Sequence, residues 1–542
     1  MPNPSTESRN YRNQHYAEQI SRFLSPWQYI DRDYTDVYIR EKIEIGRPEL
    51  ALELFDELSR ANTIAIIGTH FGDEGKGRLV DNKLQQLLSI PGVKMAYVVR
   101  FQGGSNAGHT VYTEDGTKVA LHQLPSSVLE PRAVGIMDQG MVINMEDLKT
   151  EIDDVEKIVG DLRGHIILSN DAILNTDLDR AMEVLNKVKS GGKSGGGTAR
   201  GIGPSYADHY SRLGNTVEEL FADDWRETFG RKYDGYTIDF DARGMALESV
   251  KVPDLRATRD TGKPVSRPVG TKQEYLNRME AIRDWYIHRD QGVADDARLR
   301  QNTYVIHEKT YGDVSRGIIF EGAQAVGLDA WLGRWPDITA SNTTIDGIAA
   351  GTGFYRSQDV REKIGVFKAT YMSSVGDAHM ITRIDLPRES VESTDGFSED
   401  QLYGLDVRDV AKERGTTTDR YRDMCFLDLA LMRYNVKMGG IEALAATHLD
   451  IAREGRPIKV CTHYVDMQGK YVPYQPGVKY QEGLIPQYIE LPGWDGEATQ
   501  KATSVDELPE NAKKFLAFVQ LQVGVPIIAA TTGPERKHLV EI

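Results

Sequence analysis

Short apolar runs alternate with amphipathic stretches between residue 63 and about residue 208. The runs, each of strand length, are TIAII (63–67), MAYVVRF (95–101), AVGIM (133–137), GMVIN (140–144) and HIILS (165–169). Before the last of these, MEDLKTEIDDVEKIV (145–159) has apolar residues at helical spacing. Continuous apolar strands that alternate with helices are typical of a parallel sheet with crossover helices. We therefore predict an α/β fold with a large, mostly parallel central sheet and flanking helices.

The segments outside this alternation differ in pattern. Residues 1–62 are polar and charged, with helical spacing in AEQISRFL and ELALELFDELSRA, and predict a helical N-terminal extension. The glycine-rich stretch at 190–204 predicts a loop that a ligand orders. The region at about 245–275, rich in Pro, Arg and Lys, predicts an exposed insertion followed by a helix in QEYLNRMEAIRDWYIHR. Residues 63–542 are otherwise expected to form one domain.

The composition predicts a soluble cytoplasmic protein. Of the 542 residues, 40% are hydrophobic and 27% charged, which is ordinary for a globular chain. The net charge of −16 argues against nucleic-acid binding, because that function requires a basic face. No apolar run has the length of a membrane span, and the N-terminus lacks an apolar signal core. Two cysteines, Cys425 and Cys461, favour a reducing compartment over a disulfide framework.

The strand at 63–67 ends in a glycine-rich loop that carries charged side chains. The loop contains Gly68, Gly72, Asp73, Glu74, Gly75, Lys76 and Gly77. A loop of this kind at the start of a helix binds phosphate through bare backbone N–H groups and the positive helix end. It is not a Walker A P-loop, because His70 and Gly77 stand where that motif needs a glycine and a Ser or Thr. A plain strand-to-helix turn is the alternative, but the acids and the lysine favour phosphate or metal binding.

A second glycine loop follows the strand at 95–101. The segment QGGSNAGHT (102–110) places Asn106 and His109 among glycines that let a ligand touch the backbone. Histidine titrates near neutral pH and can give a proton to a leaving oxygen. A surface histidine is the alternative. Ligands in α/β proteins lie beyond the carboxyl ends of the strands, so two such loops predict one ligand site.

Together the two loops resemble the adenylosuccinate synthetase family, whose enzymes join aspartate to IMP at the expense of GTP. Further segments match in the family's order: RGIGPSY (200–206), FEGAQ (320–324), ITASNTT (338–344), GTTTDRYR (415–422), THLD (447–450), LPGW (491–494) and TTGPER (531–536). The similarity runs from about Thr63 to the C-terminus. It implies that residues 63–542 form the catalytic domain of such a ligase, with a fold like that of P-loop NTPases but without a Walker A motif. The extension at 1–62 is a departure from the family.

The resemblance implies the catalytic roles. Asp73 is the general base that removes the N1 proton of IMP, and with Gly108 it holds Mg²⁺. His109 gives a hydrogen bond or proton to O6 and to the phosphoryl group in transfer. Lys76 neutralises phosphate charge, and Gln324 completes the catalytic set. For Asp73 alone, a helix N-cap is the structural alternative.

The resemblance also implies the binding residues for IMP and aspartate. The implied residues are Asn106, Thr198, Arg212, Gln324, Thr339, Thr416, Thr417, Thr418 and Arg420. Arg212 matches an arginine that crosses a dimer interface into the neighbouring site, so a homodimer is implied. Arg420 suits aspartate because its fork binds a carboxylate in two places. The loop departs from the family at Asp419, where a glycine is usual, and at Tyr421, where an arginine is.

GTP, the implied co-substrate, has a binding set that spans three parts of the chain. Its members are Gly72, Glu74, Gly75, Lys76, Gly77, Arg78, Gly108, Thr110, Arg422, His448, Asp450, Thr531, Thr532 and Gly533. Asp450 can accept hydrogen bonds from guanine N1–H and N2–H₂. His448 replaces a lysine of the family's T-K-L-D element, and its ring can stack on the base.

Two alternatives to the IMP-dependent ligase remain at this stage. One is a relative that acts on (d)GMP and makes a 2-aminopurine product; retention of Asp73 favours IMP. The other is a non-catalytic nucleotide-binding protein, and the joint presence of Asp73, Lys76, His109, Gln324 and Arg420 argues against it.

Overall fold

A computed structural model describes residues 62–113, 115–189, 199–374, 380–387, 393–414 and 421–542. The helical extension expected at 1–62 lies outside the described residues, apart from Asn62. Residues 190–198 of the expected ligand-ordered loop also lie outside them. Among the described residues, no helix is long and apolar enough to cross a membrane.

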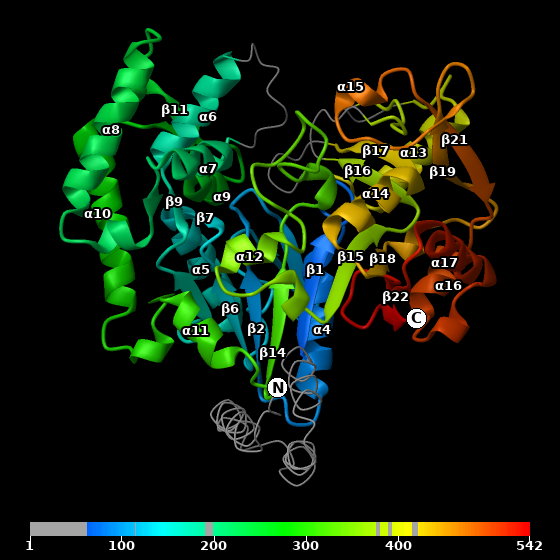
Figure 1. Cartoon of the computed structure of the whole chain (residues 1–542), viewed down its shortest axis with the longest axis horizontal. Coiled ribbons are helices and arrows are strands. Elements are labelled where there is room, and N and C mark those ends of the chain that lie inside the picture. The colour runs from blue at the N-terminus through cyan, green and yellow to red at the C-terminus, as the bar shows by residue number, and fades with distance from the viewer. Residues whose placement is uncertain (1–61, 114, 190–198, 375–379, 388–392, 415–420) are drawn as a thin grey trace, which may run out of the picture.

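The centre of the molecule is a ten-stranded sheet (Figure 1). Its order is β13 (Arg300–Gln301), β8 (Ile166–Ser169), β6 (Ala133–Met137), β2 (Met95–Arg100), β14 (Arg316–Glu321), β1 (Thr63–Gly68), β15 (Glu362–Lys368), β18 (Ala443–Thr447), β22 (Ile527–Thr531) and β23 (Leu539–Glu541). Every neighbouring pair is parallel except β22 and β23. The prediction of a large, mostly parallel sheet is therefore confirmed.

Smaller sheets flank the central one. A four-stranded sheet contains β10 (Asn215–Thr216), β9 (Ile173–Asn175), β7 (Met141–Asn144) and β3 (Gly103–Gly104), and a five-stranded sheet contains β16 (Tyr371–Ser374), β17 (Asp423–Asp428), β19 (Ile458–Val465), β20 (Tyr471–Val472) and β21 (Ile485–Leu491). Two strand pairs are β4 (His109–Tyr112) with β5 (Lys118–Leu121), and β11 (Lys251–Pro253) with β12 (Ser266–Pro268). The run at 140–144 is thus a strand as predicted, but it belongs to the four-stranded sheet.

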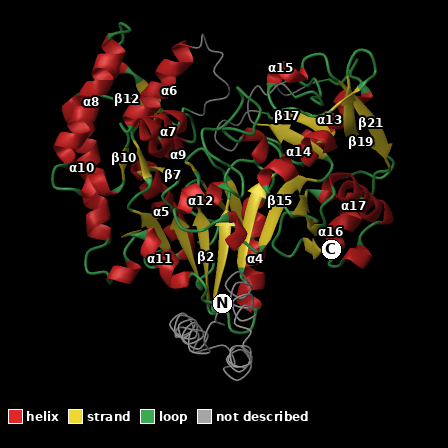
Figure 2. Ribbon diagram, in the orientation of Figure 1, coloured by secondary structure: helices red, strands yellow, loops and turns green. Residues whose placement is uncertain are grey.

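Helices surround the sheets, with α8 and α10 at one edge of the molecule (Figure 2). They are α4 (Lys76–Ser89), α5 (Met145–Val159), α6 (Asp177–Lys189), α7 (Ile202–Ser211), α8 (Trp225–Asp241), α9 (Leu255–Thr261), α10 (Lys272–Arg289), α11 (Thr303–Thr310), α12 (Gly347–Thr352), α13 (Glu399–Val410), α14 (Leu429–Gly439), α15 (Val478–Gln481), α16 (Gly496–Lys501) and α17 (Glu510–Val523). Short 3₁₀ turns are η1 (Glu218–Phe221), η2 (Leu247–Ser249), η3 (Asp295–Ala297), η4 (Val326–Leu328), η5 (Ser357–Asp359), η6 (Leu449–Ile451) and η7 (Val505–Glu507). Helix α5 confirms the helix predicted in MEDLKTEIDDVEKIV, and α10 confirms the helix predicted in QEYLNRMEAIRDWYIHR.

Helix α5 illustrates how local sequence sets an element. The side chain of Asn144 caps its N-terminus by accepting from the backbone N–H of Asp147 at 3.0 Å, and Gly160 ends it with φ 90°. An N-cap of this kind typically contributes about 1 kcal/mol. On the inner face Leu148 and Ile152 are fully buried, and truncation of either to alanine should cost about 2–5 kcal/mol.

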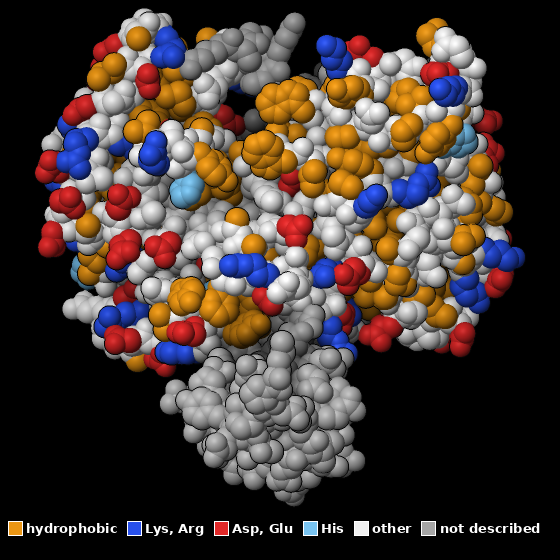
Figure 3. All heavy atoms as spheres, viewed as in Figure 1, with side chains coloured by type: hydrophobic (Ala, Val, Ile, Leu, Met, Phe, Trp, Pro, Cys, Tyr) orange, Lys and Arg blue, Asp and Glu red, His pale blue; other side chains and the backbone are white. Residues whose placement is uncertain are grey.

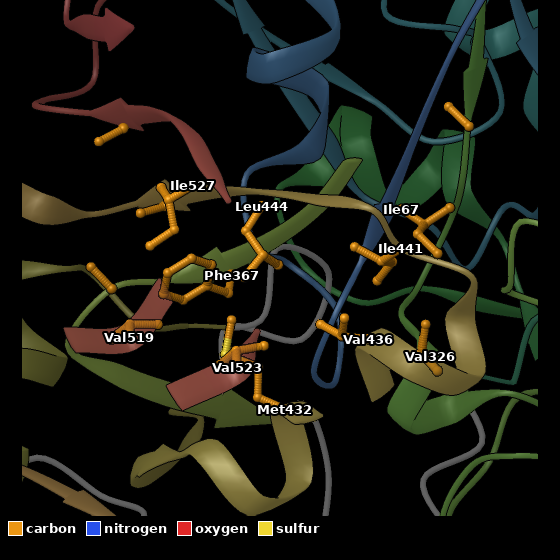
Figure 4. Packing of buried hydrophobic residues seen from close by; sticks show 14 of the residues in the cluster. Ile67, Val326, Phe367, Met432, Val436, Ile441, Leu444, Val519, Val523 and Ile527 are labelled. Atoms are coloured by element: carbon orange, nitrogen blue, oxygen red, sulfur yellow. The ribbon is translucent and has the colours of Figure 1, made fainter. Parts of the chain in front are cut away.

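The core fills both faces of the central sheet. Strand β1 is buried along its whole length, as expected of a parallel strand covered by helices on both sides. One buried cluster contains Phe367 of β15, Leu444 of β18 and Val519 of α17 (Figure 4). The segment at 245–275 is less exposed than expected, because Val252 and Val269 are fully buried.

Charged side chains of both signs lie on the surface. On the side shown in Figure 3, Lys and Arg side chains are interspersed with Asp and Glu. They do not gather there into a basic patch.

Candidate active site

Three neighbouring strands bring the predicted catalytic residues to one edge of the sheet. Strands β2, β14 and β1 are adjacent in that order, and all three run parallel. The loop that contains Asp73 follows β1, the loop that contains Asn106 and His109 follows β2, and Gln324 follows β14. Because parallel strands present their carboxyl ends on the same side, these loops converge there (Figure 1).

The glycine loop after β1 is held by its own carboxylate. Glu74 accepts hydrogen bonds from the backbone N–H of His70 at 3.2 Å and of Gly72 at 2.7 Å, and from Lys76 Nζ at 2.8 Å. Gly72 and Gly75 have φ of 90° and 87°, which a side chain rarely adopts. The Glu74 carboxylate therefore binds groups of its own loop. A bound nucleotide would contact the backbone of this loop. Lys76 is buried against Glu74 at the start of α4.

Asp73 projects from this loop and remains reachable. Its backbone is left-handed, with φ 58°, a conformation that places non-glycine residues under strain and is concentrated at functional sites. The Asp73 side chain is 39% exposed and forms an ion pair with Arg422, whose guanidinium also binds Glu413 Oε2 at 2.9 Å. Arg422 therefore lies against the glycine loop.

His109 forms a buried pair with a residue that the sequence analysis did not single out. Its Nδ1 is hydrogen-bonded to Glu321 at the end of β14, and the other carboxylate oxygen accepts from Ser126 N–H at 2.9 Å. Burial lowers the pKa of His109. Although burial alone would raise it, the interaction with His109, including its hydrogen bond, and the charge of Arg100 lower the pKa of Glu321 to about 2. The ring is thus neutral, with Nδ1–H donating to a carboxylate.

The outer edge of this histidine ring has no protein partner. Nε2 of His109 is buried and accepts or donates no hydrogen bond among the described residues. A Cβ on Gly77 would lie 2.9 Å from Ser126 Oγ and 3.2 Å from the His109 Cβ. Only the absence of a side chain at Gly77 lets α4 and His109 approach this closely.

Two amides in the loops after β2 and β14 are also unsatisfied among the described residues. Oδ1 of Asn106 and both amide atoms of Gln324 are buried without a hydrogen-bond partner among the described residues. Gln324 has a strained φ of 54°, and a Cβ on Gly103 would lie 3.1 Å from its Oε1. Buried polar atoms are normally paired, so these amides are typical of groups that a ligand satisfies. Thr339 is joined to the same region through its N–H, which donates to the Leu328 carbonyl at 2.7 Å.

Hydrogen bonds also draw the third part of the predicted nucleotide site to the glycine loop. Thr447 Oγ1 donates to the Glu74 carbonyl at 2.8 Å, and the His448 N–H donates to Thr531 Oγ1 at 3.2 Å. Arg78 Nη2 donates to the Glu535 carbonyl at 2.6 Å. The segments at 447–450 and 531–536, far apart in sequence, therefore border α4. Thr532 is fully buried, and Gly533 packs against the ring of His538.

Arg212 is not brought into this cluster: it follows α7 and is exposed, with φ 65°. Gly108 is exposed and directly precedes His109. Thr110 is half-buried in β4, and a Cβ on Gly77 of α4 would lie 3.5 Å from its carbonyl oxygen. Thr198, Thr416, Thr417, Thr418 and Arg420 lie outside the described residues.

The donor set is compatible with Mg²⁺. Within the described residues, no group of three or more His, Cys, Asp or Glu side chains could hold a metal. Mg²⁺ in phosphoryl-transfer sites typically needs only one or two carboxylates besides substrate phosphates and water. The reachable Asp73 carboxylate and the carbonyl of the exposed Gly108 fit that pattern.

Sequence comparison identifies the family. The sequence profile of adenylosuccinate synthetase matches residues 65–540. The chain belongs to the adenylosuccinate synthetase family. Adenylosuccinate synthetase from Colwellia psychrerythraea is 31% identical over 486 residues, covering 88% of this chain and 97% of that protein. Adenylosuccinate synthetase 1 from Laccaria bicolor is 31% identical over 479 residues with the same coverage. The resemblance stated from the motifs is confirmed, as is the expectation of a ligase.

A solved member of the adenylosuccinate synthetase family shares the fold. The fully ligated enzyme from Plasmodium falciparum superposes with a TM-score of 0.71 and 27% identity, over 89% of this chain and all of that one. The α/β fold predicted from the alternation of strands and helices is therefore confirmed by a second structure.

Proposed function

We propose that this chain catalyses the GTP-dependent ligation of L-aspartate to IMP in purine biosynthesis. The products would be adenylosuccinate, GDP and phosphate, formed through 6-phosphoryl-IMP. One observation supports this most strongly: Asp73, His109 and Gln324 all lie beyond the carboxyl ends of three adjacent parallel strands. Nε2 of His109 and the amide of Gln324 have no hydrogen-bond partner among the described residues. We further propose a cytoplasmic homodimer in which Arg212 completes the neighbouring site.

The residue types match the chemistry of the first step. O6 of IMP is a poor leaving group and must be phosphorylated before an amine can displace it. Removal of the N1 proton makes O6 nucleophilic, and Asp73 is the exposed carboxylate for that task. Negative charge on Glu321 stabilises the imidazolium that forms when Nε2 of His109 takes a proton. The pair can therefore present Nε2–H to O6 or to the phosphoryl group.

The remaining groups bind and orient. Mg²⁺, held by Asp73 and Gly108, would neutralise charge on the phosphates. The backbone of the loop from Gly72 to Gly77, with Lys76, would hold the phosphates at the start of α4. Asn106, Thr198, Gln324 and Thr339 would bind IMP, and Thr416, Thr417, Thr418 and Arg420 would bind the aspartate carboxylates.

GTP is the proposed donor because of Asp450. Its carboxylate can only accept, and guanine offers N1–H and N2–H₂, whereas adenine has no donor at N1. A carboxylate that the bound base shields from water and leaves unpaired costs at least about 1–3 kcal/mol, which corresponds to a roughly tenfold or larger preference.

A purified-protein assay tests the proposal. Protein incubated with Mg²⁺, GTP, aspartate and either IMP or dGMP is followed by absorbance at the purine and by phosphate release. The proposal predicts an aspartate-dependent product with IMP. Turnover with dGMP alone would assign the related 2-aminopurine reaction, and nucleotide binding without turnover would identify a non-catalytic protein.

A further inference from the structure

The buried carboxylate of Glu413, close to the proposed GTP site, accepts hydrogen bonds from four other side chains. Glu413 is 2% exposed and accepts from Tyr371 Oη at 2.6 Å, from Ser373 Oγ at 2.9 Å, and from Lys368 and Arg422. Burial by itself favours the protonated acid, but the charge of Lys368 holds the pKa of Glu413 below its usual range. Glu413 is therefore an anion that can only accept hydrogen bonds.

This anion determines the direction of the next hydrogen bond. Tyr371 is fully buried, and burial raises the pKa of its phenol well above its ordinary value. The phenol has a single proton, which must point to Glu413. Tyr371 Oη also lies 3.1 Å from His448 Nδ1. Since the phenol has no second proton, His448 Nδ1 must be the donor in this contact.

His448 is thereby held as one tautomer. Its ring meets Tyr371 edge-on, with centroids 5.8 Å apart and an interplanar angle of 87°. Burial and the charge of Lys368 lower the pKa of His448 to about 4, although Glu413 and Asp450 act in the opposite direction. A neutral ring with its proton on Nδ1 has a lone pair on Nε2. No described residue is hydrogen-bonded to that Nε2.

The position of His448 makes this lone pair relevant to nucleotide choice. His448 has a left-handed backbone, φ 58°, and immediately precedes η6, which contains Asp450. One Asp450 oxygen accepts from Gln500 Nε2 at 3.0 Å. The segment at 447–450 borders the glycine loop through Thr447.

We propose that Tyr371 is a positioning residue that fixes His448 with Nε2 as a hydrogen-bond acceptor, so that His448 and Asp450 together select a donor base that carries N–H groups on its edge. The inference rests on the proposed function, because it assigns the nucleoside triphosphate site. Guanine meets two acceptors with N1–H and N2–H₂. A lysine at position 448 would offer only donors, so this chain would read the base through a different hydrogen-bond pattern.

The tautomer is measured directly by ¹⁵N NMR of protein labelled at histidine, without any ligand or turnover. The His448 signals are assigned by their loss in His448→Gln. The wild-type protein should show a protonated Nδ1 and an unprotonated Nε2 at pH 7. A ring protonated on Nε2 in the wild type would overturn the proposal without recourse to any variant.

A pair of matched variants tests the role of Tyr371. Tyr371→Phe removes the acceptor for Nδ1–H and should convert His448 to a mixture of tautomers. Tyr403→Phe is the control, because Tyr403 is a half-buried tyrosine whose phenol donates to the Thr370 carbonyl at 2.9 Å. The control should leave the His448 signals unchanged. Identical spectra of Tyr371→Phe and wild type would contradict the assignment.

Nucleotide selectivity provides the functional arm. Binding of GTP, ITP and ATP is measured by calorimetry, and kcat/KM is measured for each. ITP has N1–H but lacks the 2-amino group. Tyr371→Phe should lower the ratio of kcat/KM for GTP to kcat/KM for ATP roughly fivefold to tenfold, as expected for loss of one oriented hydrogen bond. The KM for IMP should change less than about twofold. An unchanged ratio would refute the selectivity role. If no triphosphate supports turnover, the proposed ligase function is contradicted. The NMR spectra and the binding measurements would still decide whether Tyr371 fixes the His448 tautomer.

Discussion

The guanidinium of Arg422 forms an ion pair with the carboxylate of Asp73, a residue 349 positions earlier in the chain. The same guanidinium binds the buried Glu413 at 2.9 Å. Arg422 therefore links the proposed general base to a buried anion that also binds Lys368. The Asp73 charge is balanced by Arg422. The proposed reaction therefore requires this pair to separate before Asp73 acts on IMP.

Asp73→Asn should abolish turnover while the protein stays folded. The amide cannot accept the N1 proton, and loss of a general base typically costs at least about 10² in rate. Its amide oxygen can still accept from Arg422, so the melting temperature should change little. Steady-state kinetics and calorimetric IMP binding provide the measurements. A variant that keeps more than about a tenth of the wild-type rate would exclude Asp73 as the base.

Glu321→Gln should lower kcat by about tenfold to a hundredfold, because the neutral amide no longer stabilises the His109 imidazolium. KM for IMP should change little. Glu151→Gln is a suitable control, since Glu151 is another buried acid that accepts from backbone N–H groups, that of Gln123 at 2.9 Å. Equal kcat values for the two variants would show that Glu321 has only a structural role.

The free energy of unfolding should fall as pH falls from about 6.5 toward 4, and His70 should contribute to this slope. Burial lowers the pKa of His70 from 6.5 to about 4, so in this window the unfolded chain binds a proton that the folded chain does not. His70→Gln should therefore lose less stability than the wild type between pH 7.5 and 5. Urea unfolding at both pH values measures the difference. A variant with the wild-type slope would show that His70 is protonated in the folded state.

Arg212→Leu should raise KM for IMP strongly without unfolding the protein, if Arg212 completes the neighbouring site. Mixed with Asp73→Asn, it should regain activity, because a hybrid dimer contains one site with neither substitution. Subunit exchange is verified independently by mass spectrometry of differentially labelled protein. A mixture that has exchanged subunits but shows no activity above its components would contradict a shared site.

Much of the central sheet could be predicted because its strands are buried on both faces. Runs such as 133–137 are continuously apolar, and their alternation with α5 indicates parallel pairing. The five-stranded sheet was not predicted. Its edge strand β21 is partly exposed and contains Pro486, so it has neither a continuous apolar run nor a regular alternation.

The loops of the candidate site could be predicted from the sequence, but the buried residues that hydrogen-bond to the site residues could not. Glycine-rich loops have a composition that shows in the sequence, so Asp73, His109 and Gln324 could be named. Glu413 and Tyr371 lie in ordinary segments, and only tertiary folding places them beside His448. Glu321 had one detectable signal, since it is an acid at the end of the buried strand β14.

The central claim is that O6 of IMP is phosphorylated before aspartate attacks. IMP labelled with ¹⁸O at C6 tests it directly, in a complete reaction with GTP, aspartate and Mg²⁺ followed by ³¹P NMR of the released phosphate. The account predicts that the label passes from C6 into inorganic phosphate, one atom for each adenylosuccinate formed. Product formation with unlabelled phosphate would contradict the account, because the C6 oxygen would then have left without becoming bonded to phosphorus.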